Sequence, residues 1–154
     1  MLRGEFRTPS GLVIPNNITK FGAETILAAA LRNTVPTFWV GLVDGVPDPA
    51  LSIQNLQEPS FTNGYGRIQI ARSNVGWPGA GDVNGEPYLE SGWLTFAASG
   101  GNFSKSIRRM MIVATQTGTT GNVIALSAAL PALRLITPTT PLADRQFKYR
   151  IYLR

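Results

Sequence analysis

The sequence contains no cysteine and no histidine. Without cysteine there are no disulfides, thiolate metal sites or cysteine nucleophiles, and without histidine the commonest general base near neutral pH is missing. Zinc sites and Ser-His-Asp triads are therefore excluded. Nine acidic residues remain for a carboxylate metal site, and they lack the spacing of a calcium-binding loop. We expect a protein that is not an enzyme and that carries no metal or cofactor.

Charge is also scarce, at 15% of the 154 residues, whereas hydrophobic residues make up 44%. The usual charged share is about a quarter. A surface with few charges is either rich in uncharged polar side chains or covered by partners, and composition leaves both open. No apolar run approaches the length of a membrane span, and the N-terminus lacks a signal-peptide pattern. We therefore expect a protein that is made in a cytoplasm and has no membrane partner.

The charges that are present are segregated along the chain. Residues 44–90 carry six acidic and two basic residues, a net charge of −4, whereas residues 91–154 carry one acidic and eight basic residues, a net charge of +7. Opposite patches can set the register of head-to-tail subunit contacts. A basic region can equally serve nucleic acid.

Residues 1–17 are predicted to form an extended N-terminal arm, because Pro9 and Pro15 forbid a helix. The arm could pad the domain, but we favour an arm that reaches over a neighbouring subunit. Its apolar grip would be a run of three residues, Leu12, Val13 and Ile14.

One amphipathic helix is predicted over residues 20–32, with Thr19 as its N-cap. Alternation of period two then predicts short strands at 37–42, 67–71, 93–98 and 147–154. Apolar runs predict two more at 107–114 and 123–130, which makes six or more strands. Residues 18–154 are therefore expected to form a single mainly β domain, a two-sheet antiparallel, jelly-roll-like sandwich with the helix packed on an edge or end. Long loops are expected at 44–65 and 73–91.

Two segments suggest chemistry but have simpler explanations. The glycine-rich segment 76–82 lacks the lysine and the hydroxyl residue of a phosphate-binding loop, so it predicts turns. Asp82, Glu86 and Glu90 recur at four-residue spacing, but glycines and a proline between them oppose a shared helix face. We expect a solvated acidic loop there.

Basic and aromatic residues supply the remaining candidates for a functional surface. Lys148, Arg150 and Tyr152 share one face of the last predicted strand, and Arg108 and Arg109 interrupt an apolar strand. We rank a subunit contact first for these residues, a solvated face second and single-stranded nucleic acid third. The three tryptophans, Trp39, Trp77 and Trp93, are also candidate packing or interface anchors. Trp39 and Trp93 lie on the side of their predicted strands that faces away from the core.

The order of several short motifs resembles a family of small tailed-phage virion proteins, described as capsid decoration or tail-fibre-like proteins. The resemblance spans roughly residues 16–154. Its motifs are Asn17–Gly22 opening the helix, Pro36–Leu42 as a strand, Glu58-Pro59 followed by Gly64–Arg67, Trp77 ahead of Leu94-Thr95-Phe96, and the turn and strand Gly118–Ala125.

The resemblance implies a structural role in a virion, with no cofactor. We expect a capsid decoration protein that oligomerises as a dimer or trimer, binds the major capsid protein and bridges capsid subunits, with other virion proteins as further partners. The capsid surface ranks above the tail because the chain is compact. The alternatives are a tail-fibre or baseplate component that contacts the host surface through Trp77 and the acidic loop, and a nucleic-acid-binding protein that uses the basic strand face.

Overall fold

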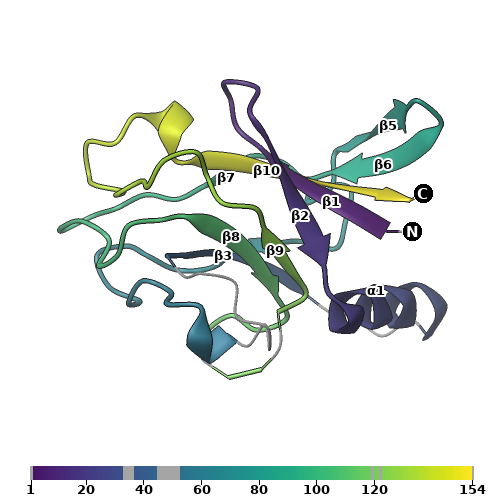
Figure 1. The fold of residues 1–154 in the computed structure, drawn as a ribbon, viewed down its shortest axis with the longest axis horizontal. Helices are drawn as coiled ribbons and strands as arrows, with labels where there is room; N and C mark the ends of the chain where they lie inside the picture. Colours follow the sequence, from purple (N-terminus) through teal and green to yellow (C-terminus); the bar gives the residue numbers. More distant parts are fainter. Residues whose placement is uncertain (1, 33–36, 45–52, 119, 122, 154) are drawn as a thin grey trace.

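The computed structural model describes residues 2–32, 37–44, 53–118, 120–121 and 123–153. Ten strands form one antiparallel sheet that curls into a half-barrel, and a 13-residue helix stands at one end (Figure 1). The strands are β1 (Leu2–Arg7), β2 (Val13–Ile18), β3 (Phe38–Val43), β4 (Ile68–Ile70), β5 (Gly79–Val83), β6 (Glu86–Glu90), β7 (Leu94–Thr95), β8 (Arg109–Val113), β9 (Ala125–Ser127) and β10 (Gln146–Leu153). The helices are α1 (Lys20–Arg32) and two short 3-10 turns, η1 (Ile53–Asn55) and η2 (Leu142–Asp144).

The sheet follows the order β4-β3-β8-β9-β2-β1-β10-β6-β5, with β7 also paired to β10. Its curl places β3 and β8 across the interior from β1, β2 and β10, so that one core fills the space between them. Phe6, Ile14 and Phe147 contribute to this core from one half of the sheet, and Val40 and Ile112 from the other. The interior is therefore the inner face of a single sheet.

A second, smaller apolar cluster covers the outer face of β3 and β8. Leu56, beside η1, is fully buried there with Met111 and Val113. Strands β3 and β8 are thus apolar on both faces, which explains why residues 109–113 show no clean alternation.

The expected N-terminal arm over residues 1–17 is wrong for residues 2–17, the part of it that the structure describes. Strands β1 and β2 lie in the middle of the sheet, between β9 and β10. Pro9 lies in the turn that joins them, where Gly11 adopts a positive φ of 86° and its N–H donates to the carbonyl of Thr8 at 3.0 Å. Pro9 and Gly11 lie in a hairpin turn because turns use proline and glycine as readily as irregular arms do, whereas Pro15 lies within β2.

The expected loop over 73–91 is also wrong in part, since it contains the β5–β6 hairpin. Asn84 and Gly85 have positive φ values of 55° and 80° between the paired residues Val83 and Glu86. Asn-Gly is the preferred pair for such a two-residue turn. The Asn84-Gly85 pair could be recognised in the sequence as a hairpin turn, but the glycines around it favoured a predicted loop over two strands.

The mainly β class with one helix is confirmed. Strands near 37–42, 67–71, 107–114 and 147–154 form as expected, whereas those at 93–98 and 123–130 shrink to β7 and β9. The described strands belong to one curled sheet, and the jelly-roll-like division into two stacked sheets stays a prediction.

Candidate interaction surfaces

Helix α1 is anchored at its first turn. The Oγ1 of Thr19 accepts a hydrogen bond from the N–H of Gly22 at 2.9 Å, as expected of an N-cap, and donates to the carbonyl of Val123 at 2.7 Å. Gly22 is the one buried residue of the helix, and a Cβ at this position would collide with the carbonyl oxygen of Ile124. From this anchor the helix projects away from the body of the sheet (Figure 1).

The apolar side of β10 that faces the core extends beyond the core. Along this face the exposed fraction is 1% at Phe147 and 3% at Tyr149, but Ile151 is only half-buried and Leu153 is 61% exposed. β1 shows the same trend, because Phe6 is fully buried and Leu2 is not. The apolar surface that makes the core therefore continues into solvent.

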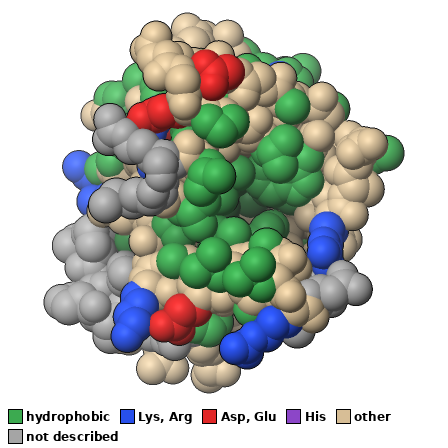
Figure 2. Space-filling model, turned by 90° about the vertical axis from the view of Figure 1, so that its right-hand side faces the viewer, with side chains coloured by type: hydrophobic (Ala, Val, Ile, Leu, Met, Phe, Trp, Pro, Cys, Tyr) green, Lys and Arg blue, Asp and Glu red, His purple; other side chains and the backbone are tan. Residues whose placement is uncertain are grey.

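The projecting half of α1 lies opposite this uncovered sheet face and forms with it a cavity of about 520 Å³. Figure 2 shows hydrophobic side chains gathered around a hollow on this side of the molecule. We call this cavity the helix groove. It is lined mainly by Leu2, Ile26, Leu27, Leu89, Ile151 and Leu153.

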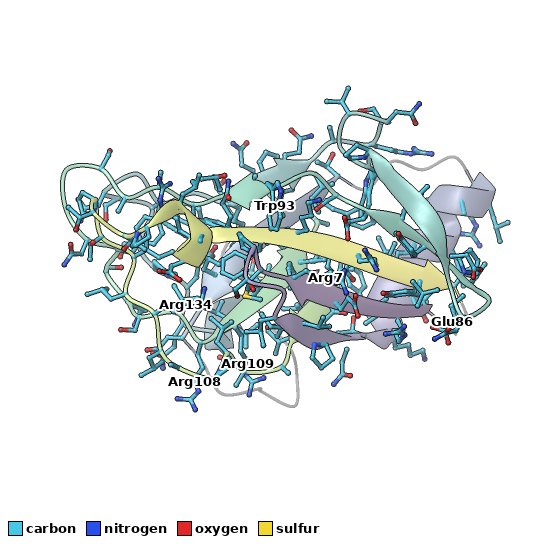
Figure 3. The ribbon with its side chains drawn as sticks, turned by 90° about the horizontal axis from the view of Figure 1, so that it is seen from above. Arg7, Glu86, Trp93, Arg108, Arg109 and Arg134 are labelled. Atoms are coloured by element: carbon cyan, nitrogen blue, oxygen red, sulfur yellow. The ribbon has the colours of Figure 1, made fainter. Side chains whose placement is uncertain are left out.

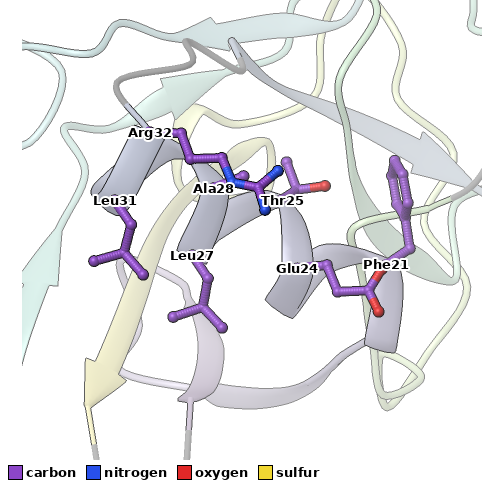
Figure 4. Close-up of a pocket in the computed structure, with 7 residues that line it drawn as sticks. All are labelled: Phe21, Glu24, Thr25, Leu27, Ala28, Leu31 and Arg32. Atoms are coloured by element: carbon purple, nitrogen blue, oxygen red, sulfur yellow. The ribbon is translucent and has the colours of Figure 1, made fainter.

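Away from the helix groove, α1 presents a second hollowed surface, of about 510 Å³ (Figure 4). Leu31 is 81% exposed on this surface. Glu24 lies near one end and Arg32 near the other, with the small residue Ala28 between them. We call this surface the outer helix face.

The side of β10 that faces away from the core carries a network of charges. Arg150 donates to Glu90 at 2.9 Å through Nε, and Lys148 lies 3.2 Å from the other oxygen of that carboxylate. The hydroxyl of Tyr152 donates to the buried Glu5 at 2.8 Å and accepts from Arg150 at 3.1 Å. Arg3, Arg7 and Glu86 extend the network along β1 and β6, and we call the whole set the polar lattice.

Electrostatics within the polar lattice favours the charged forms. Partial burial by itself would raise the pKa of Glu90, but hydrogen bonds from Arg150 and Lys148 outweigh it and hold that pKa below its usual range. Burial likewise opposes the charge on Arg150, yet Tyr152 and Glu90 raise its pKa above the ordinary value. The charged side chains of the lattice therefore pair with one another inside the chain.

This pairing corrects two expectations. The face of Lys148 and Arg150 is not a free basic surface, because both side chains form ion pairs with Glu90. Glu90 and Glu86 do not belong to a solvated loop either, since both lie on β6 and Glu86 binds Arg3 at 2.9 Å. Acidic and basic segments that are far apart in the sequence meet here inside one chain, because β6 and β10 are neighbours in the sheet.

A buried clasp joins two of the motifs that carry the family resemblance. The guanidinium of Arg67 donates to both oxygens of Glu58, at 2.9 and 2.7 Å, and to the carbonyl of Thr115 at 2.8 Å. The hydroxyl of Tyr65 donates to Glu58 at 2.5 Å, and burial raises the pKa of this phenol, with the Glu58 charge adding to the effect. The clasp pins the loops after β3 and β8 together, which is a structural role.

The three tryptophans differ in their surroundings. Trp77 is partly buried and packs edge-on against Phe38 and Tyr149, at the margin of the main core. Trp39 packs on the second cluster, as one of the two expected alternatives has it. Trp93 stays 44% exposed, with Lys148 Nζ 4.7 Å from its ring centroid. It is the most exposed of the three tryptophans.

The other candidates divide in the same way. Ile14 is buried in the core and Leu12 packs against it, whereas Val13 on the opposite face is 41% exposed. Arg108 is exposed and Arg109 is half-buried. An isolated β-bridge between Ile107 and Arg134 brings a third arginine beside them (Figure 3). Burial and the neighbouring Arg108 lower the pKa of Arg109. Among the described residues no carboxylate pairs with these three arginines.

The helix groove was missed from the sequence, although its residues were visible. Leu27 lies within the amphipathic helix predicted over residues 20–32, and Leu153 lies within the strand predicted over residues 147–154. The available signal was the combination of Phe21, Leu27 and Leu31, which spreads large apolar residues over more of the helix than one sheet edge can cover.

No protein-family model matches the chain, and a search of the curated proteins finds no similar sequence. Within the described ranges, no helix is both long and apolar enough to cross a membrane. The same residues contain no group of three or more acidic side chains that could hold a metal ion.

Proposed function

We propose that the chain is a non-enzymatic structural subunit of a tailed-phage particle, a capsid decoration protein whose helix groove receives a segment of another virion protein. The observation that carries the proposal is the apolar inner face of β1 and β10, which continues from the core into an uncovered groove. Exposed apolar surface of this kind marks protein contacts. The resemblance of the motif order supplies the virion setting.

The structure changes how such a subunit would bridge its neighbours. An arm is no longer available, because residues 2–18 are central strands whose removal would open the sheet. Bridging falls instead to the helix groove. The jelly-roll-like sandwich remains part of the proposal, since the curl faces β3 and β8 toward β1 and β10 across the core.

The test uses empty heads assembled from the major capsid protein of the phage that encodes the chain. Wild-type protein should co-sediment with the heads to saturation, and cryo-EM should place its density on the shell. Leu153→Asp should weaken binding at least tenfold, because it puts a charge into the groove. Leu133→Asp is the matched control, since Leu133 is 53% exposed, close to the 61% of Leu153, and does not line the groove.

Failure of the wild-type protein to bind heads would overturn the decoration proposal. Density on the tail of intact particles would favour the tail-fibre or baseplate alternative. Equal binding by wild type and Leu153→Asp would be compatible with a location on the capsid, but it would show that the helix groove is not the binding surface.

A second candidate function, nucleic-acid binding, now rests on Arg108, Arg109 and Arg134 in place of the strand face of Lys148 and Arg150. DNA binding that weakens with salt at a slope of several phosphates, and that Arg108→Glu reduces, would promote it. Salt-independent or absent binding would remove it.

A further inference from the structure

The outer helix face has an internal symmetry that the helix groove lacks. Its residues recur at helical spacing along one side of α1, and they are Phe21, Glu24, Thr25, Ala28, Leu31 and Arg32. Leu27, at the edge of this face, also lines the helix groove. Glu24 and Arg32 are each four residues from Ala28, in opposite directions. Rotation by 180° about an axis through Ala28 therefore exchanges the acidic end of this face with its basic end.

We propose that the occupant of the outer helix face is the same face of a second copy of this chain, with the two α1 helices antiparallel and crossing at Ala28. Such a two-fold interface is isologous, so each contact occurs twice. Glu24 of each copy then faces Arg32 of the other. This proposal goes beyond the proposed function, because that function needs only the helix groove.

Contacts among the described residues leave the Glu24 and Arg32 side chains available to a partner. Arg32 has no ion pair among the described residues, and Glu24 has one weak pair, with Lys20 at 3.9 Å. The Lys20 and Glu24 side chains are 92% and 64% exposed, so that pair contributes little. Replacing the Lys20–Glu24 contact by one between Glu24 and Arg32 of a partner therefore costs little free energy.

The shape of the face fits the same arrangement. Ala28 at the crossing lets the two helices approach to about 8–10 Å between their axes. In this register Leu31 of one copy lies opposite Thr25 of the other, beside the hollow of about 510 Å³ on the outer helix face (Figure 4). Burial of an 81% exposed leucine gives the apolar part of the contact.

The contact is small. A helix of 13 residues is about 20 Å long, and one such pair buries less than a standard interface. We therefore expect dimers with a dissociation constant of tens of micromolar, roughly, that weaken as salt screens the ion pairs. On a particle surface many adjacent copies would raise the effective concentration.

The decisive experiment is a charge exchange, measured by analytical ultracentrifugation of the full chain from 1 µM to 1 mM. Glu24→Arg and Arg32→Glu should each weaken self-association at least tenfold, because like charges then face each other at both contacts. An equimolar mixture of the two variants should form dimers again, since the variant with two arginines meets the variant with two glutamates. The double variant E24R/R32E should also dimerise.

Lys20→Glu is the control, because it changes the charge of the same helix at a residue outside the outer helix face. It should leave the dissociation constant within about threefold, and circular dichroism should show equal helix content in all variants. A wild type that stays monomeric to 1 mM, or a mixture that fails to pair, would overturn the proposal. Association of all variants at wild-type strength would place the contact elsewhere. Head binding is measured separately, so either result leaves the proposed function to its own test.

Discussion

The two faces of β10 differ in how far their side chains find contacts within the chain. On the outward face, Lys148 and Arg150 both pair with Glu90 inside the chain. On the inward face, the apolar row passes from the buried Phe147 to the exposed Leu153 and lacks cover where the helix groove begins. The outward charges are thus paired within the chain, whereas the inward apolar row extends beyond the core, and exposed apolar surface of this kind is typical of interaction sites.

The sharpest way to test this comparison is to truncate both ends of the apolar row. Phe147→Ala should reduce the free energy of unfolding by about 3–5 kcal/mol, because it opens a cavity in the core. Leu153→Ala on the same face should change it by no more than about 0.5 kcal/mol, since most of that side chain is already in water. Chemical denaturation measures both, and equal losses would mean that Leu153 is covered within the folded chain.

A smaller effect is expected from the polar lattice. Arg150→Met should cost about 2–3 kcal/mol of unfolding free energy, because Glu90 and Tyr152 lose a charged hydrogen-bond partner at a site with little water. Arg108→Met is the matched control, since Arg108 is exposed and has no ion pair among the described residues. If both variants were equally stable, the lattice would be a loosely solvated surface.

The smallest effect concerns pH. The folded-state pKa of Glu90 lies below its ordinary value of 4.5, so its contribution to stability is present above pH 4.5 and is lost as the pH falls through the folded-state pKa. Glu90→Gln should therefore be less stable than wild type at pH 7, and the difference should narrow between pH 5 and pH 3. Urea denaturation at several pH values measures this, and a constant difference would contradict the ion pairing.

Several local features could be predicted from the sequence because they depend on neighbours along the chain. The Thr19 cap and the apolar spacing of residues 20–32 place the helix, and alternation over residues 147–154 places β10. The Asn84-Gly85 turn belongs to the same class, although the glycines around it led to a predicted loop. Hairpins need only local turn chemistry, so this error was avoidable.

Other features depended on which strands become neighbours. β1 and β2 pair between β9 and β10, and this contact turns an expected arm into the middle of the sheet. Placement of β6 beside β10 brings Glu90 to Arg150, across 60 residues of sequence. Neither could be inferred from composition, because segregated charges are compatible with pairing inside a chain or between chains.

By itself, then, the sequence determined the local elements of this protein, namely the helix, the long closing strand and the absence of histidine and cysteine chemistry. Only the tertiary structure decided which of its surfaces are satisfied. Burial depends on what lies opposite a residue in space: β1 and β10 extend past the core, and α1, anchored at Gly22, stands away from them. The uncovered apolar groove between them is a property of that arrangement, since each of its residues has an ordinary place in its own helix or strand.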